Sequence, residues 1–216
     1  MNNDIIAIDG PAGAGKSTVS KRLAEQLGYT YVDTGAMYRA AAWKMQESDI
    51  NVDDTEAITK MLSEINLSFQ DGHIILNEQD ISAFIRTPQI SELTSRVSTN
   101  SALREKMLTL QRSLCVQGSF VVEGRDIGTV VFPHVRHKFY LDASARIRAE
   151  RRYSELQLSG VHSDFAALMK AIEERDKRDS ERAFAPLKKA QDACYILTDT
   201  YSIEEVVGLI IEQLER

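Results

Sequence analysis

Short apolar runs alternate with longer periodic segments along the whole chain. Runs of three or four apolar residues are typical of buried strands, whereas the longer segments repeat their apolar positions with helical spacing. We expect strands at 5–8, 29–32, 120–122, 138–141 and 195–197, each followed by a helical segment. Strands that are apolar throughout and alternate with helices indicate a parallel sheet covered on both faces. The pattern therefore predicts an α/β fold with a five-stranded parallel sheet flanked by helices.

One segment departs from this rhythm. From 67 to 81, apolar and polar positions alternate around Asp71-Gly72, a dipeptide typical of tight hairpin turns. A helical stretch near 57–65 precedes the hairpin. After it, Pro88 follows a capping threonine and starts a helix that is predicted to run as one piece towards Val116. We therefore expect an α/β core that carries a small inserted subdomain with antiparallel strands.

The composition is that of a folded soluble protein, with 43% hydrophobic and 27% charged residues. The net charge of −6 disfavours binding along a nucleic-acid duplex. No apolar stretch approaches the roughly 18 residues of a membrane span, and residues 1–4 lack the basic start of a signal peptide. Cys115 and Cys194 have no C-x-x-C spacing and the histidines no metal-ligand spacing, so we expect reduced cysteines and no structural metal. These features predict a cytoplasmic protein that binds neither nucleic acid nor membrane.

A phosphate-binding motif follows the first predicted strand. Residues 10–17 read Gly-Pro-Ala-Gly-Ala-Gly-Lys-Ser and match G-x-x-x-x-G-K-[ST] between a strand and a helix, the setting that this loop requires. Its glycines let several N–H groups point into one concavity, and the helix adds the positive end of its dipole. Lys16 would reach the β- and γ-phosphates, and the Ser17 hydroxyl would bind Mg²⁺. The motif predicts that a nucleoside triphosphate binds here.

Two further polar runs stand at the ends of predicted strands, where ligands bind in open α/β sheets. The first begins at Asp33 and ends in Arg39, and the second contains Arg125 and Asp126. The two arginines would hold a second phosphate group. Two more arginine sets follow later in the chain: Arg175, Arg178 and Arg182 at helical spacing, and Arg146, Arg148, Arg151 and Arg152 after the fourth strand. No N-K-x-D element of a GTPase and no apolar strand ending in Asp-Glu is present, which favours a small kinase.

Four runs together resemble the bacterial cytidylate kinases, a family of nucleoside monophosphate kinases. They are the phosphate loop, the run from Asp33 to Arg39, the run Glu-Gly-Arg-Asp-Ile-Gly-Thr-Val-Val-Phe-Pro from Glu123, and Arg-Asp-Lys-Arg-Asp-Ser-Glu-Arg from Arg175. The resemblance implies Mg²⁺-dependent transfer of the γ-phosphoryl group of ATP to CMP or dCMP. It also implies a P-loop fold in one kinase domain, which we expect to be monomeric. Its parts would be a core (about 1–35, 117–145 and 163–216), a subdomain that binds the nucleoside monophosphate (about 36–116) and a lid (about 146–162).

The resemblance also implies roles for individual residues. The ATP site would comprise Gly10, Pro11, Ala12, Gly13, Ala14, Gly15, Lys16, Ser17 and Thr18. The CMP site would comprise Thr34, Arg39 and Arg125 on the phosphate, Ser95, Arg104 and Asp126 on cytosine, Arg175 and Asp179 near the sugar, and Tyr38 and Arg182. The catalytic residues would be Lys16, Arg39, Arg125 and the lid arginines Arg151 and Arg152. Thr34 and Glu123 stand where relatives carry Ser and Asp, so no metal role is assigned to Glu123.

The acceptor itself leaves alternatives open. A monophosphate is largely anionic near neutral pH, because its second pKa is about 6, and it needs no general base. The chain would instead act by alignment and charge neutralisation. Other small P-loop kinases act on UMP, AMP or an alcohol, and for an alcohol Asp33 would be the candidate base. A regulatory module that binds nucleotides without transferring phosphate is the alternative outside the enzymes.

Overall fold

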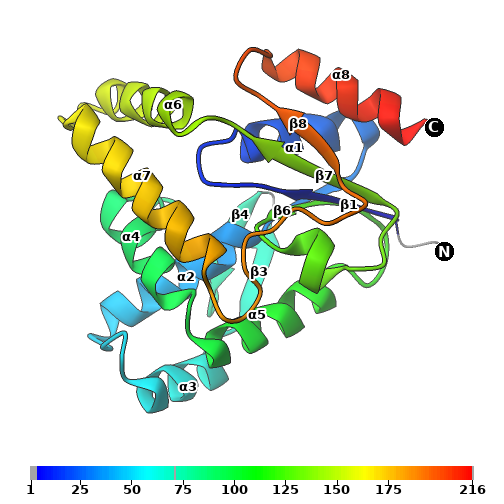
Figure 1. Ribbon diagram of the computed structural model, residues 1–216. Helices are drawn as coiled ribbons and strands as arrows, with labels where there is room; N and C mark the ends of the chain where they lie inside the picture. Colours follow the sequence, from blue (N-terminus) through cyan, green and yellow to red (C-terminus); the bar gives the residue numbers. More distant parts are fainter. Residues whose placement is uncertain (1–3, 71, 216) are drawn as a thin grey trace. The chain divides into compact units, whose positions relative to one another are not determined.

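The computed structural model describes residues 4–70 and 72–215 and divides the chain into two compact units (Figure 1). The first unit is formed by the chain up to Val32 together with Gln117–Arg216. The second unit is Asp33–Val116, so it is inserted into the first. Residues 1–3, on which the expectation of no signal peptide rested, lie outside the described part.

A parallel sheet forms the centre of the first unit. Within the described residues it has five strands: β1 (Asp4–Asp9), β2 (Thr30–Asp33), β6 (Ser119–Gly124), β7 (His137–Asp142) and β8 (Cys194–Leu197). Their order is β2-β6-β1-β7-β8, with β1 paired in parallel to both β6 and β7. Strands β1 and β6 are buried at almost every residue, so the side chains on both faces of these two strands are covered. The predicted α/β fold with a five-stranded parallel sheet is confirmed.

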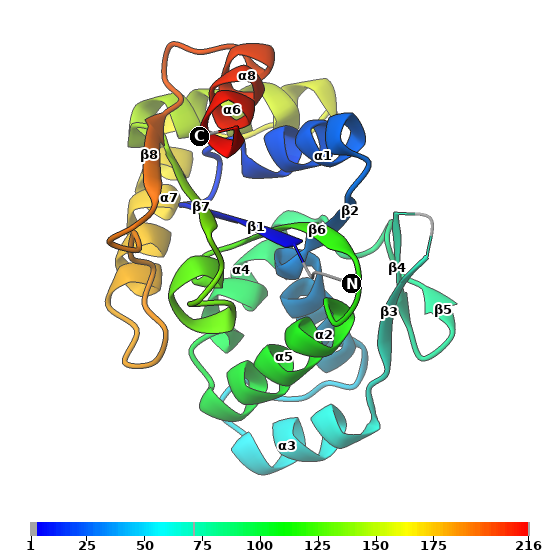
Figure 2. The same cartoon turned by 90° about the vertical axis from the view of Figure 1, so that its right-hand side faces the viewer.

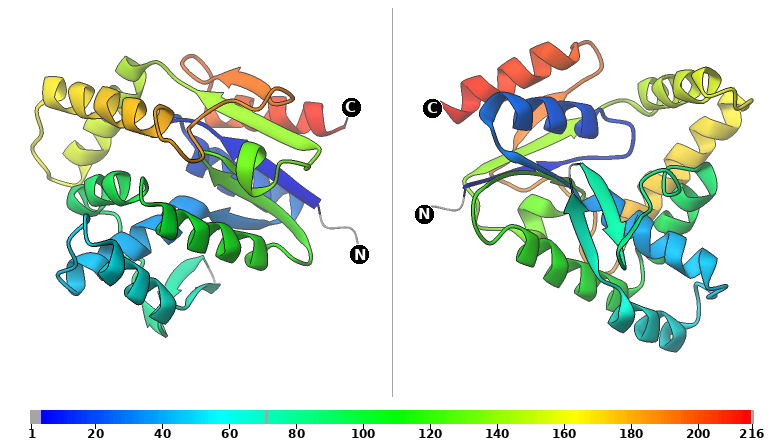
Figure 3. Two further views of the ribbon diagram at one scale, coloured as in Figure 1. Left: turned by 60° about the horizontal axis from the view of Figure 1, so that its bottom comes forward. Right: turned by 180° about the vertical axis from the view of Figure 1, so that it is seen from behind.

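Four helices belong to this unit within the described residues: α1 (Lys16–Leu27), α6 (Ala145–Leu158), α7 (Phe165–Ser180) and α8 (Ile203–Leu214). Helices α1 and α8 lie on one face of the sheet (Figure 2). Their apolar residues, among them Leu23 and Ile210, close a core with Ile6, Ile8 and Leu141 of the strands. Helices α6 and α7 pack against each other beyond the end of β7 (Figure 3).

One expected helix of this unit is only a single turn. The segment after β6 is η1 (Ile127–Val131), a five-residue π-helical turn in which the Asp126 carbonyl accepts the N–H groups of Val130 and Val131. The carboxylate of Asp9 accepts two N–H groups at the start of this segment, which holds it against β1. This tertiary anchor explains why a short turn replaces the regular helix expected after this strand.

The second unit has its own core. Its helices are α2 (Thr34–Glu47), α3 (Thr55–Glu64), α4 (Pro88–Val97) and α5 (Ser101–Leu114), and its strands are β3 (Leu67–Gln70), β4 (His73–Leu76) and β5 (Gln79–Asp80). The strands form a small antiparallel sheet, in which Phe69 pairs with Ile74. The fully buried Met37, Met45 and Met107 lie in the core that joins the helices to it. The predicted hairpin is thus present, although Asp71 of its turn is outside the described residues.

The prediction of one helix from Pro88 towards Val116 is wrong. The chain forms two helices that are separated at Ser98–Asn100. The side chain of Asn100 accepts the N–H of Leu103 at 3.0 Å and so caps a new helix. Residues such as Ser, Thr and Asn favour caps because their side chains compete for backbone hydrogen bonds. A run of these residues interrupts an otherwise helical pattern.

None of the helices in the described part of the chain is long and apolar enough to cross a membrane.

Candidate functional site

The phosphate loop connects β1 to α1 and can only be built around glycine at its first position. Gly10 has φ +148°, and a Cβ there would lie 1.9 Å from the carbonyl oxygen of Leu141 on β7. Gly13 has φ +79° and would bring a Cβ to 3.0 Å from the Cβ of Arg148 on α6. The glycines therefore permit a left-handed backbone that is pressed closely against its neighbours.

Four successive carbonyl groups of the loop, from Pro11 to Ala14, are held by side chains. Lys16 Nζ donates to Pro11 O at 2.6 Å, and Arg148 Nη1 donates to Ala12 O at 3.2 Å. The next two carbonyl oxygens, of Gly13 and Ala14, accept from Arg151 Nη1 at 3.3 Å and from Thr198 Oγ1 at 3.1 Å. These contacts turn the carbonyl oxygens of the loop towards protein donors, an arrangement that suits backbone N–H groups directed at an anionic ligand.

The start of α1 adds to this anion site. Its N-cap residue, Gly15, has no side chain that could accept the first N–H groups of the helix. Unsatisfied N–H groups and the helix dipole together favour a phosphate at this position. Ser17 and Thr18, in the first turn, are exposed. The loop and the helix end therefore form a site suited to the phosphates of a nucleotide.

Lys16 lies in this site in an unusual environment for a lysine. Its side chain is buried, and burial together with the nearby charge of Arg125 lowers the pKa of Lys16 to about 7. The carboxylates of Glu123 and Asp9 oppose this shift in part. A buried cation that lacks a full counter-charge is stabilised by an anionic ligand, which fits the role predicted for Lys16.

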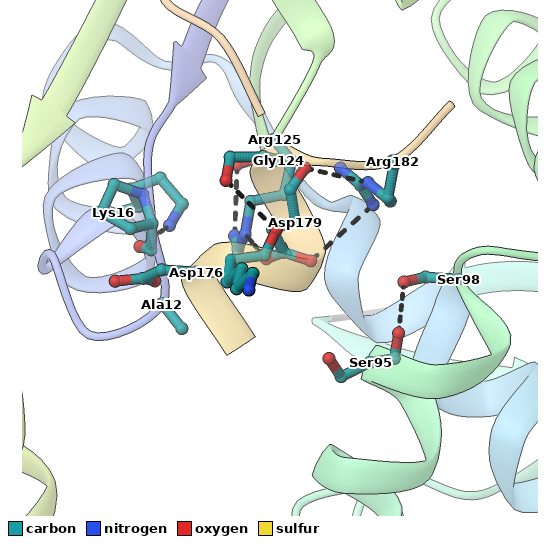
Figure 4. Close-up of polar contacts among 12 residues, drawn as sticks. Ala12, Lys16, Ser95, Ser98, Gly124, Arg125, Asp176, Asp179 and Arg182 are labelled. Carbon is teal, nitrogen blue, oxygen red and sulfur yellow. Dashed lines mark hydrogen bonds and ion pairs between the residues drawn. The ribbon is translucent and has the colours of Figure 1, made fainter. Parts of the chain in front are cut away.

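A cluster of arginines around Asp179 lies near the carboxyl end of β6 (Figure 4). Arg125 Nε donates to Asp179 Oδ2 at 3.1 Å, and Arg182, which lies just beyond the end of α7, donates from Nε to Asp179 O at 3.2 Å. Burial raises the pKa of Asp179, but the charges of Arg125, Arg175 and Arg182 outweigh it and keep this pKa below its usual value. Three guanidinium groups gather around this carboxylate, and such a concentration of positive charge is suited to an anion.

Three acidic residues stand at the same end of the sheet. Asp9 accepts the N–H groups of Ile127 and Gly128, each at 2.8 Å, and burial and the nearby Asp126 raise the pKa of Asp9 to about 6. Glu123 is buried and accepts a hydrogen bond from Tyr31 Oη. Asp9 thus positions the segment that carries Asp126, a role that the sequence reasoning missed.

The two lid arginines are placed differently. Arg151 donates to Thr198 O at 2.7 Å as well as to the phosphate loop. Arg152 donates to Glu155 Oε2 at 3.0 Å, one turn further along the solvent side of α6. Arg151 thus contacts the phosphate loop, whereas the hydrogen bond given for Arg152 is to Glu155 on the same helix. The catalytic role of both residues stays a prediction.

In the second unit, Asp33 organises the start of α2. Its Oδ1 accepts the N–H of Ala36 at 2.8 Å and so caps the helix, and its Oδ2 accepts from Arg39 at 2.7 Å and from Arg86 at 3.4 Å. Thr34, the first residue of α2, is buried. Arg39 Nε is buried without a hydrogen-bond partner among the described residues. Asp33 therefore acts as an anchor for a guanidinium that still has a donor to offer.

Ser95 and Arg104, two of the three residues predicted to contact the base, lie in this unit together with Tyr38, which was predicted for the CMP site without a specific role. Arg104 is buried, its guanidinium carbon lies 5.6 Å from the centre of the Tyr38 ring, and its Nη1 donates to Ser98 O at 3.4 Å. Ser98 Oγ in turn donates to Ser95 O at 2.9 Å (Figure 4). Tyr38, Ser95 and Arg104 thus form one polar cluster, to which Ser98 belongs although no motif had pointed to it.

The loop offers suitable oxygen donors for Mg²⁺ bound together with a nucleotide. Mg²⁺ is usually held by one or two protein oxygens, substrate phosphates and water, and it needs no closed cage of carboxylates. The exposed hydroxyl of Ser17 in the first turn of α1 fits such a site. No group of three acidic, histidine or cysteine residues able to hold a metal is found in the described part of the chain.

Comparison with known proteins places the chain in a family. The cytidylate kinase family model matches residues 6–216. Cytidylate kinases of Bacillus cytotoxicus and Thermodesulfovibrio yellowstonii are 47% and 43% identical to the chain, over 98% and 97% of it and 97% of each relative. An uncharacterized protein from Eubacterium ventriosum has the same fold, with a TM-score of 0.55 at 14% identity over 98% of both chains. Since the family model and both relatives match the chain over nearly its full length, the chain belongs to the cytidylate kinase family and is a transferase of the nucleoside monophosphate kinase kind.

Proposed function

We propose that the chain transfers the γ-phosphoryl group of ATP to CMP and dCMP, which yields ADP with CDP or dCDP. The observation that carries this proposal is the pairing, within one unit, of the phosphate loop with the arginine cluster at Asp179. The loop suits the phosphates of a donor nucleotide, and the cluster suits a second anionic group. A kinase that joins two phosphorylated substrates needs both.

The donor side would act mainly through positioning. The N–H groups of the loop and of α1 bind the β- and γ-phosphates, and Lys16 supplies a charge at the transferring group. The Ser17 hydroxyl would hold Mg²⁺ together with ATP, and the bound metal would supply further charge neutralisation. Lys16 must leave Pro11 O to reach the nucleotide, which a flexible four-carbon side chain permits.

The acceptor side would align the monophosphate without a base. In the first unit we assign phosphate binding to Arg125, cytosine recognition to Asp126, and binding near the sugar to Arg175, Asp179 and Arg182. In the second unit we assign phosphate binding to Thr34 and Arg39, and base binding to Tyr38, Ser95 and Arg104. An in-line attack by an anionic phosphate oxygen requires alignment and charge neutralisation only.

The contacts of Asp33 argue against an alcohol acceptor. A general base needs a free lone pair directed at the hydroxyl that it deprotonates. Both carboxylate oxygens of Asp33 already accept hydrogen bonds, from Ala36 N–H, Arg39 and Arg86. Three of the roughly four lone-pair sites of the carboxylate are thus occupied, which favours a role in holding Arg39 over one in removing a proton.

A panel of acceptors tests the proposal. The chain is incubated with ATP, Mg²⁺ and CMP, dCMP, UMP, AMP or no acceptor, and ADP formation is measured. We expect ADP to form with CMP and dCMP at the highest kcat/KM. Equal rates with UMP or AMP would contradict the substrate assignment, and ADP formation that is independent of any acceptor, or absent, would contradict the transfer reaction itself.

A further inference from the structure

Arg148 on α6 occupies a position that its place in an arginine-rich helix does not suggest. Only 4% of this residue is exposed. Its Nε donates to Ala143 O at 2.8 Å, and its Nη1 donates to Ala12 O in the phosphate loop at 3.2 Å. The same guanidinium binds both carboxylate oxygens of Asp176 on α7, at 3.0 and 2.5 Å.

This geometry is specific to arginine. A bidentate pair with a carboxylate fixes the plane of the guanidinium as well as its position. The remaining N–H groups then point in fixed directions, towards the loop and towards the end of β7. Arg148 therefore joins three parts of the first unit that are distant in sequence: the phosphate loop, the segment after β7, and α7.

Helix α7 carries two of the residues assigned to the acceptor side, Arg175 and Asp179. Arg175 precedes Asp176, and Asp179 follows it by about one helical turn. Asp179 in turn binds Arg125 at the end of β6. A chain of contacts thus runs from Ala12 through Arg148 and Asp176 along one turn of helix to Asp179 and Arg125, and Figure 4 shows Asp176 next to Ala12.

We propose that Arg148 is a positioning residue that couples the donor and acceptor sites, so that a nucleotide in the phosphate loop tightens binding of the monophosphate. The proposal rests on the proposed function, because it takes the loop as the donor site and the Asp179 cluster as part of the acceptor site. The hydrogen bonds of Arg148 go to protein oxygens of Ala143, Ala12 and Asp176, so its effect on the substrates would be indirect. Arg148 fixes the distance and direction of α7 relative to the loop, on which in-line transfer depends.

The experiment measures this coupling directly. Calorimetry gives the Kd of CMP alone and in the presence of adenylyl imidodiphosphate, for the wild type, Arg148→Lys and Asp176→Asn. In the wild type we expect the analogue to tighten CMP binding about fivefold or more. In both variants we expect the Kd of each ligand alone to stay within about threefold of the wild-type value. The ratio of the CMP Kd without the analogue to the CMP Kd with it should fall towards one, and kcat should fall about tenfold or more.

Arg146→Lys is the matched control. Arg146 lies on the same helix, but its side chain is 77% exposed and pairs with Glu150 at 2.9 Å. We expect this variant to keep the wild-type tightening and kcat. Lysine at 148 keeps the positive charge but cannot hold both oxygens of Asp176 and Ala12 O at once. If Arg148→Lys fails to fold, Asp176→Asn, which changes a partly exposed carboxylate, provides the same test.

The outcomes separate this proposal from the proposed function. If Arg148→Lys and Asp176→Asn lower only the melting temperature and keep the wild-type tightening and kcat, Arg148 is merely structural and the coupling is wrong. A wild type in which the analogue does not change CMP affinity also overturns the coupling, even where CMP is phosphorylated. Failure of the wild type to bind or phosphorylate CMP overturns the proposed function instead.

Discussion

Lys16 is a single residue in which binding and stability oppose each other. Its burial provides a cation for the nucleotide, but the same burial destabilises the chain without a ligand. We predict that Lys16→Met loses most transfer activity. A charge directed at the transferring group lowers the activation free energy by about 3 kcal/mol, which corresponds to about two orders of magnitude in kcat. Steady-state rates with ATP and CMP test this, and a near-normal kcat would contradict the donor site.

The same variant also tests how the free energy of unfolding depends on pH. The pKa of Lys16 is about 7 in the folded chain and near 10.5 in the unfolded chain, so the unfolded state binds more protons between these values. The free energy of unfolding should therefore rise with pH from about 7 to 10.5. Lys16→Met should be more stable than the wild type at pH 7, with a difference that shrinks towards pH 10.5. Urea unfolding across this range measures it, and a constant difference would contradict the shifted pKa.

Asp126 offers a test of base choice. Cytosine presents an amino donor where uracil presents a carbonyl acceptor, and an ionised carboxylate can only accept. A buried polar group without its partner costs roughly 1–3 kcal/mol, which corresponds to about tenfold to a hundredfold discrimination. An amide can offer a donor or an acceptor, so Asp126→Asn should narrow the gap in kcat/KM between CMP and UMP. An unchanged ratio would show that Asp126 does not contact the base. Its role would then lie in the structure around η1 and in its charge interaction with Asp9.

At the scale of elements, local chemistry explains where most helices begin. Asp33, Thr87 and Asn100 accept N–H groups of the helices that follow them, and Ser202 and Glu205 form a complete capping box. The Thr87-Pro88 start was predicted from the sequence, because such a cap acts within one turn. The break at Ser98–Asn100 was missed because its polar residues lie within an otherwise helical pattern.

The turn after β1 provides a test at this scale. Gly10→Ala would place a methyl group 1.9 Å from a backbone oxygen of β7, at a φ that other residues rarely adopt. Since backbone cannot move aside cheaply, we expect a loss of at least about 2 kcal/mol in the free energy of unfolding, together with loss of ATP binding.

Gly208→Ala in α8 serves as the control for this substitution. Its Cβ would meet no atom within 4 Å, so we expect unchanged or slightly increased stability. Urea unfolding of both variants decides the point. Equal stability of Gly10→Ala and wild type would mean that the loop does not need its observed backbone.

At the scale of the whole molecule, the chain divides its chemistry between two units with separate cores. The phosphate loop, which we propose as the donor site, belongs to the first unit, whereas Arg39 belongs to the second. We therefore predict that Arg39→Ala raises the KM for CMP or lowers kcat, while the affinity for ATP stays nearly unchanged. Calorimetry with each nucleotide, combined with steady-state kinetics, measures the two effects.

The exposed Arg96 on α4 gives a control in the same unit, since Arg96→Ala should leave both affinities as they are. A parallel loss of ATP affinity in Arg39→Ala would place Arg39 on the donor side.

The net charge of −6 does not conflict with a site for two anionic substrates, because only the local arginine clusters need to be positive.

The sequence by itself determined the α/β fold, the phosphate loop and the family. Apolar periodicity and the backbone freedom of glycine act over a few residues, so they remain legible in the linear order. The tertiary structure alone decided which side chains hold the loop. Arg148 reaches Ala12 across 136 positions and Thr198 reaches Ala14 across 184. Contacts between residues so far apart in the sequence depend on how α6 and the end of β8 pack beside the loop, and no local pattern encodes that packing.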